Sequence, residues 1–171
     1  MAALEVASRG AIFDDARVYR YVLTRTLKRD ATGRTVSFVC LNPSKADEHI
    51  DDNTVRRCLR FAHEWGYTHV NVLNIFALRS TDPRALYASA DPVGPLNDYW
   101  INSRVGCSDL IVAAWGNHGK HLERSKKVRG ILSRHMVYCF GITKEGEPKH
   151  PLYLPLDAEL MPLPQVPSVR G

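Results

Sequence analysis

The chain has 171 residues, of which 44% are hydrophobic and 24% charged, and its formal net charge is +5. This composition excludes a disordered or fibrous protein, and the length suffices for a buried core. No apolar run approaches the roughly 20 residues that cross a bilayer, and the N-terminus lacks a signal-peptide pattern, so we expect a cytoplasmic protein without membrane contact. The positive charge allows an anionic partner such as nucleic acid without establishing one.

The N-terminal part predicts two strands. Residues 1–16 form a weakly patterned lead-in, and the alternation over 18–27 is typical of a half-buried strand. We interpret the polar segment 28–34 as the tip of a β-hairpin. The apolar run 35–41 predicts a central strand, which ends at Asn42-Pro43 because proline lacks a ladder donor.

A helix is expected over residues 53–65, with Asp52 as its N-cap and Gly66 as its stop. Four apolar residues recur at i, i+3, i+4 and i+7 and predict its buried face: Val55, Cys58, Leu59 and Ala62.

The rest of the chain alternates between strands and helices. The expected elements are a strand over 69–76, helices over 83–88 and 96–105, a strand over 110–115, a basic helix over 120–134 and a strand over 136–140. This order predicts a three-layer α/β/α fold with a mainly parallel central sheet and an N-terminal β-hairpin. We expect one domain over 1–160, followed by an irregular proline-rich tail over 161–171.

In such open sheets, ligands bind beyond the carboxyl ends of the strands. Asn42, Asn74 and the turn at Asn117 follow or end predicted strands, and His150 lies one loop further on. We therefore expect these polar residues at one edge of the sheet.

Each of these residues has a functional and a plain interpretation. The Asn42-Pro43 turn could hold a water molecule or be an ordinary Asx-Pro turn. Asn74 could read a base edge or be satisfied by backbone, and Phe76 could stack on a base or fill the core. His150 could donate to a developing negative charge or be a surface histidine before a proline.

Charged residues near the strand ends are open to similar alternatives. Basic residues there either hold phosphates or form a solvated face: Arg56, Arg57, Arg79, Arg84, Lys120 and Lys149. Asp47, Asp51 and Asp52 could orient these arginines, act as an auxiliary acid or base, or cap the helix.

Metal and cofactor chemistry are not expected. The four cysteines form no C-x-x-C pair, so we interpret them as free thiols of a reducing compartment. His118 and His121 lie close together in sequence, but no third ligand at suitable spacing completes a metal site.

Five segments resemble a bacterial family of unknown function, DUF1643. Its patterns LNPS-x-AD, DD-x-T-x-RR, N-x-FA-x-R-x-T-x-P, AAWG and G-x-P-x-HPLY are similar to residues 41–47, 51–57, 74–83, 113–116 and 146–153. This resemblance covers nearly the whole chain but implies no activity.

A more distant resemblance is to the uracil-DNA glycosylase superfamily. Residues 40–44 are similar to its G-[IM]-NPG loop, 73–74 with 79–83 to its TN and DP segments, and 115–118 to its WG strand end. His150-Pro151 is similar to its closing HPS segment. Ser44 and Leu152 depart from these patterns, at a glycine and a small residue respectively.

The superfamily resemblance implies roles for the strand-end residues. Asn42 would position the hydrolytic water or stabilise the sugar cation, and Asn74, with Pro43 and Phe76, would bind the flipped base. His150 would hydrogen-bond the departing base. A further group would bind the DNA phosphates: Ser44, Lys45, Arg56, Arg57, Arg79, Asn117 and Lys149.

Three functions follow as hypotheses. The first is a DNA N-glycosylase that excises uracil or another altered base without a cofactor or metal. The second is a related pocket for free nucleotides or nucleosides, and the third is a non-catalytic nucleic-acid-binding module. The residues indicate neither the base nor the oligomeric state.

Overall fold

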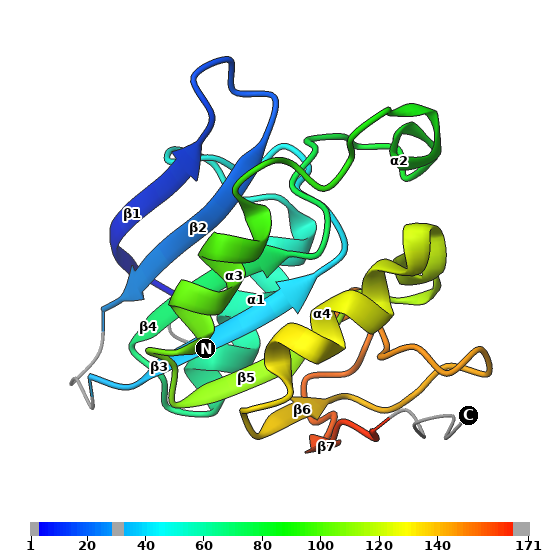
Figure 1. Ribbon diagram of the computed structural model, residues 1–171. Helices are drawn as coiled ribbons and strands as arrows, with labels where there is room; N and C mark the ends of the chain where they lie inside the picture. Colours follow the sequence, from blue (N-terminus) through cyan, green and yellow to red (C-terminus); the bar gives the residue numbers. More distant parts are fainter. Residues whose placement is uncertain (1–3, 29–32, 166–171) are drawn as a thin grey trace.

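The computed structural model describes residues 4–28 and 33–165, which form a mixed α/β fold around one seven-stranded sheet (Figure 1). The strands are β1 Val6–Phe13, β2 Arg20–Leu27, β3 Thr35–Cys40, β4 His69–Asn74, β5 Leu110–Ala113, β6 Val137–Cys139 and β7 Met161–Pro162. The helices are α1 Asn53–Glu64, α2 Arg84–Ala88, α3 Asn97–Val105 and α4 Arg124–Leu132, with a 3₁₀ helix η1 at Asn117–Glu123.

The strand order is β1-β2-β4-β3-β5-β6-β7. The four central strands β4, β3, β5 and β6 are parallel, whereas β2 pairs with β4, β1 with β2 and β7 with β6 in antiparallel fashion. The sheet as a whole is therefore mixed, and the parallel pairing that the sequence predicts is confined to its centre.

Helices cover both faces of the sheet. On β3, Val36, Phe38 and Cys40 pack in one core with α1, whereas Val39 packs in a second core with α3 and α4. Figure 1 shows α1 behind the sheet and α3 and α4 in front of it. The alternation of side chains along a strand produces this division, because successive residues point to opposite faces.

Helix α1 forms where the sequence predicts it. The Asp52 carboxylate accepts a hydrogen bond from the Val55 N–H at 2.9 Å, as expected of an N-cap. The buried face comprises Val55, Cys58, Leu59, Phe61 and Ala62. After Trp65 the backbone turns at Gly66, whose φ is 82°.

Three sequence expectations need correction. The lead-in contains β1, which pairs with β2 in antiparallel fashion. The hairpin expected across residues 28–34 is not formed, because β3 pairs with β4 and β5 and not with β2. Residues 29–32 of the expected hairpin tip lie outside the described residues. The predicted basic helix is broken, because Leu122 and Glu123, the last two residues of η1, have left-handed φ values of 55° and 51°.

The expected irregular tail, 161–171, begins with β7, whose residues pair with Tyr138 and Cys139 of β6. Residues 166–171 lie outside the described part of the chain. No helix among the described residues is long and apolar enough to span a membrane.

Candidate functional site

The carboxyl ends of β3, β4 and β5 meet at one edge of the sheet. Cys40 pairs with Asn74, and Val39 pairs with both Leu73 and Ala113. From β3 the chain passes to α1 on one face, and from β5 it passes to α4 on the other. Such a change of face between neighbouring parallel strands opens the crevice where ligands bind in this class of sheet.

Asn42 braces the loop that follows β3. Its carboxamide nitrogen donates to the carbonyl oxygens of Pro43 at 3.1 Å, Ser80 at 3.0 Å and Leu78 at 3.4 Å. The Ser80 N–H in turn donates to the Pro43 carbonyl at 2.8 Å. These hydrogen bonds occupy the Asn42 nitrogen, which joins the two loops. The carboxamide oxygen of Asn42 is therefore the group able to accept a hydrogen bond from a water molecule. Pro43 itself is buried.

Asn74 and Phe76 lie deeper than the sequence suggests. Asn74 is 2% exposed, and its Oδ1 accepts a hydrogen bond from Arg20 Nη2 at 3.1 Å. Phe76 is fully buried, and the centroid of its ring lies 5.8 Å from the centroid of the His121 ring. Phe76 is thus a core residue in this structure, contrary to the expectation that it stacks on a base. Sequence reasoning missed Arg20, because a strand-initial arginine resembles an exposed one.

His150 lies beside the end of β5, where its Cβ is 3.7 Å from the position that a Cβ on Gly116 would occupy. His150 is half-buried, and this burial lowers its pKa below the usual value of 6.5, against an opposing effect of the Asp52 charge. Its Nδ1 accepts the Leu152 N–H at 3.3 Å. The neutral ring therefore carries its proton on Nε2.

A buried carboxylate fixes the hairpin that leads to His150. Glu147 is 7% exposed, and its Oε2 accepts hydrogen bonds from Trp115 Nε1 at 2.7 Å and Ser125 Oγ at 2.5 Å. The neighbouring Pro148 carbonyl accepts the Gly116 N–H at 2.8 Å. These bonds join the hairpin to β5 and α4. The G-x-P pattern around Glu147 did not predict this anchoring role, since the partners Trp115 and Ser125 are distant from Glu147 in the sequence.

Asp52 links the helix cap to the site. Besides capping α1, its Oδ2 accepts the Ala46 N–H at 3.3 Å, and the Ala46 carbonyl accepts Arg20 Nη1 at 2.8 Å. The charge of Asp52 acts on both Arg20 and His150. Of the three predicted acids, Asp52 is the one whose charge opposes the lowering of the His150 pKa.

The other two acids serve the loop itself. Asp51 pairs with the buried Arg25 at 2.7 Å and with Arg9 at 2.8 Å. The Asp47 carboxylate accepts the N–H groups of His49 and Ile50, which lower the pKa of Asp47. Both carboxylates therefore hold the loop in this structure, and Asp51 orients two arginines, one of the alternatives that the sequence left open.

The predicted phosphate-binding residues divide into two groups. Lys45, Lys149 and Arg56 are exposed, and no acidic side chain in the described ranges pairs with them. The others are partly buried or already engaged: Ser44 is half-buried, Arg57 lies over the Phe61 ring, Arg79 donates to the Arg17 carbonyl, and Asn117 bonds Thr143 and Glu145. The first group is the available cationic rim.

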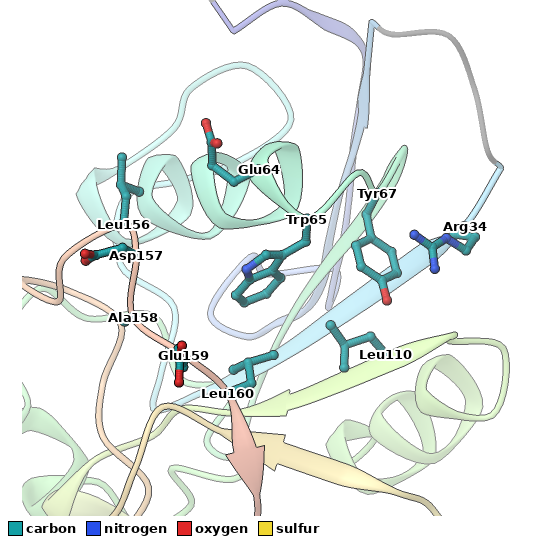
Figure 2. A pocket seen from close by; sticks show the side chains of 10 residues that line it. All are labelled: Arg34, Glu64, Trp65, Tyr67, Leu110, Leu156, Asp157, Ala158, Glu159 and Leu160. Carbon is teal, nitrogen blue, oxygen red and sulfur yellow. The ribbon is translucent and has the colours of Figure 1, made fainter.

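Two hollows lie at the opposite, amino end of the parallel strands. The larger, of about 670 Å³, has Trp65 and Tyr67 on one side and Leu110 and Leu160 on the other (Figure 2). Three acids and one arginine also line it: Glu64, Asp157, Glu159 and Arg34. This excess of negative charge disfavours a phosphate-bearing ligand.

The second hollow, of about 290 Å³, lies beside Thr35 and His69 at the starts of β3 and β4. Neither hollow contains a candidate site residue. Within residues 4–28 and 33–165, no three His, Cys, Asp or Glu side chains gather as a metal site would require.

The chain belongs to a family described as a protein of unknown function, DUF1643, whose family model matches residues 20–152. The match contains every candidate residue of the carboxyl edge, from Arg20 to His150. Comparisons with curated proteins and with solved structures gave no match.

Proposed function

We propose that the chain is a DNA N-glycosylase with a fold like that of the uracil-DNA glycosylase superfamily, acting on uracil or another altered base. One observation carries the proposal: His150 is half-buried beside the carboxyl end of β5, and its Nδ1 accepts the Leu152 N–H, so that the neutral ring offers an Nε2–H donor. The four segments that resemble the superfamily support it, since three of them belong to this edge.

The proposed reaction breaks the bond between the sugar C1′ and the base nitrogen. The bonding electrons leave with the base, and the His150 Nε2–H donates to the base oxygen on which negative charge develops. The Asp52 carboxylate stabilises the positive charge on the sugar, and water held by the Asn42 oxygen adds to C1′. The proton lost by that water ends on the departing base, so the products are an abasic sugar and the free base.

Exposed residues on the segments that follow β3 and β6 suit a DNA substrate. Lys45, Lys149 and Arg56 supply positive charge for the backbone. Tyr153 is 93% exposed and has a left-handed φ of 71°. An aromatic ring held outward on such a loop suits stacking on a base beside the extruded nucleotide.

The test is cleavage of labelled oligonucleotides that each carry one altered base, followed by alkali to break abasic sites. Wild type should release at least one base. His150→Ala should lose about 10²–10³-fold in rate, the usual effect of removing one donor to a developing anion. The matched control is His118→Ala, since His118 is exposed and bonds the Tyr87 hydroxyl at 3.0 Å.

A folded wild type that releases no base, or a His150→Ala variant as fast as His118→Ala, contradicts the proposal. Binding measured across salt concentrations separates the alternatives. DNA held through several phosphates should bind far more weakly as salt rises. A pocket for free nucleosides should show little salt dependence, and a non-catalytic module should show the DNA salt dependence without base release.

A further inference from the structure

On the face of the sheet that α3 covers, neighbouring strands change from apolar to polar residues along their length. Near the carboxyl edge this face carries Val22, Leu73 and Val39, which pack in the core with α3 and α4. Toward the amino ends of β3 and β4 it carries hydroxyl, amide and imidazole groups, which neighbour one another across three strands: Thr24 and Thr26 of β2, Asn71 and His69 of β4, and Ser37 and Thr35 of β3. Residues two apart along a strand share a face, so these six residues form one polar floor.

The second hollow, of about 290 Å³, lies between this polar floor and the end of α3. All the floor residues except Ser37 line it, and Ser103, Arg104 and Cys107 line it from the helix end. Ser37 is fully buried and accepts Asn71 Nδ2 at 3.0 Å. Among the described residues, no aspartate or glutamate lines this hollow, in contrast to the larger one. Its lining therefore favours an anion where that of the larger hollow does not.

Arg104 brings an uncompensated positive charge to this hollow. No acidic side chain in the described ranges forms an ion pair with it. Its Nε–H is buried and donates to no group in the described part of the chain, and its guanidinium lies over the Trp100 ring, 5.6 Å from the centroid. Arg25 also lines the hollow, but Asp51 pairs with it at 2.7 Å. Because a buried N–H without a partner is costly, the expected partner of Arg104 is an acceptor that enters the hollow.

Neutral groups around Arg104 can complete the binding of an anion. The hydroxyls of Thr24, Thr35 and Ser103 form no hydrogen bond with another residue in the ranges 4–28 and 33–165. Thr26 Oγ1 and His69 Nδ1 bond each other at 3.3 Å, which leaves Nε2 of the ring available. These groups come from three strands and a helix, so they reach the hollow from several directions. A phosphate group accepts hydrogen bonds from several directions through its tetrahedral oxygens, whereas a carboxylate accepts them in one plane.

We propose that this hollow is a binding site for a phosphate group, either the free ion or a small phosphate ester, held by Arg104 and by the hydroxyl groups around it. Its volume lies just below the ~300–1,000 Å³ of pockets for drug-sized ligands, so the ligand is small. The site lies at the opposite end of the parallel strands from His150, and the inference is independent of the proposed glycosylase activity.

Isothermal titration calorimetry of the full chain with inorganic phosphate, glycerol phosphate and acetate tests the site. At least one of the two phosphate compounds should bind at millimolar concentration, and acetate should bind at least ~10-fold more weakly because its acceptors lie in one plane. Arg104→Gln should weaken phosphate binding at least ~10-fold, the effect of losing a charged hydrogen-bond donor. The matched control is Arg134→Gln, which removes the same charge from an exposed position and should bind like wild type.

Tighter binding of glycerol phosphate identifies an ester as the ligand, and tighter binding of inorganic phosphate identifies the free ion; either result supports the site. Circular dichroism shows whether Arg104→Gln folds. Ser103→Ala is the second variant, because Ser103 is exposed and the loss of its hydroxyl should weaken binding by about 5-fold without unfolding the chain.

Three results overturn the inference: no binding of either phosphate compound by the folded wild type, binding of acetate as tight as that of phosphate, or binding that is unchanged in folded Arg104→Gln. Where Arg104→Gln does not fold, unchanged binding in Ser103→Ala overturns it instead. Each of these results leaves the glycosylase proposal standing, since base release is measured separately.

Discussion

Replacement of Asp51 by asparagine should destabilise the fold markedly. The Arg25 side chain is fully buried, and Asp51, at 2.7 Å, is its acidic partner with 11% of its own side chain exposed. Removing one partner of a buried ion pair costs about 3–5 kcal/mol. Arg25 keeps carbonyl acceptors at Thr24, Asp47 and Ile50, so we expect a loss at the lower limit, about 3 kcal/mol.

Thermal unfolding followed by circular dichroism measures this loss. About 3 kcal/mol should lower the Tm of a chain of this size by ~6–12 °C. Glu5→Gln is the matched control, since it breaks the Glu5–Lys28 ion pair, whose two side chains are 62% and 60% exposed. Exposed pairs contribute about 0–1 kcal/mol. Equal losses in the two variants would refute the assignment of Asp51 as the partner of a buried charge.

Three further results are expected. Because the folded-state pKa of His150 is below 6.5, its neutral ring contributes stability that is present above pH 6.5 and is lost as pH falls through that lowered pKa. Urea denaturation of His150→Asn should therefore show a weaker loss of stability on the acid side of pH 6.5, and an unchanged profile would argue against burial of the ring. Leu122→Asn should raise stability by about 1 kcal/mol in the same assay, because Leu122 is 62% exposed with a φ of 55° that asparagine tolerates better; a loss would contradict this reasoning. Gly119→Ala should lose ~1–3 kcal/mol, since its Cβ would lie 2.3 Å from Trp115 Cδ1, whereas Gly130→Ala meets no atom within 4 Å and should lose nothing.

Local patterns in the sequence predicted the elements whose causes are local. Helix α1 depends on the spacing of its apolar residues and on the Asp52 cap, both of which lie within the helix and its first turn. The central strands are likewise short apolar runs bounded by polar residues. By contrast, β1 carries exposed residues at Ala7, Ser8 and Arg9, and its pairing with β2 supplies the missing stabilisation. Pairing of this kind is not visible in a strand's own composition.

The sequence predicted where the candidate residues lie relative to the strands but not which residues they contact. The rule for parallel strands placed Asn42 and Asn74 at one edge, because it depends only on strand direction, and His150 was expected one loop beyond the last predicted strand. The burial of Asn74 depends on Arg20, which is 54 residues away in sequence. The anchoring of the His150 hairpin depends on Trp115 and on Ser125, 22 residues before Glu147. Side-chain partners at such separations follow from the completed fold, not from spacing.

Buried arginines explain how long, irregular loops at the carboxyl edge are held in place. Arg20 donates to the Ala46 carbonyl, Arg25 to those of Asp47 and Ile50, and Arg124 to that of Ile75. None of these carbonyls belongs to a residue within a helix or strand, and a guanidinium offers several donors in a fixed plane.

The same buried arginines also bear on how the positive charge of the chain is distributed between its interior and its surface. Arg20, Arg25 and Arg124 are at most 2% exposed, so three of the 23 basic residues serve the interior and contribute little to the surface. Arg25 and Arg124 are also neutralised by Asp51 and Asp98. Because these two acids are also counted in the net charge of +5, the buried groups account for only one of the five positive charges, and the surface keeps most of the excess. If the proposed glycosylase binds DNA, we therefore expect its backbone phosphates to be held by exposed basic residues such as Lys45, Arg56 and Lys149, and not by the buried arginines.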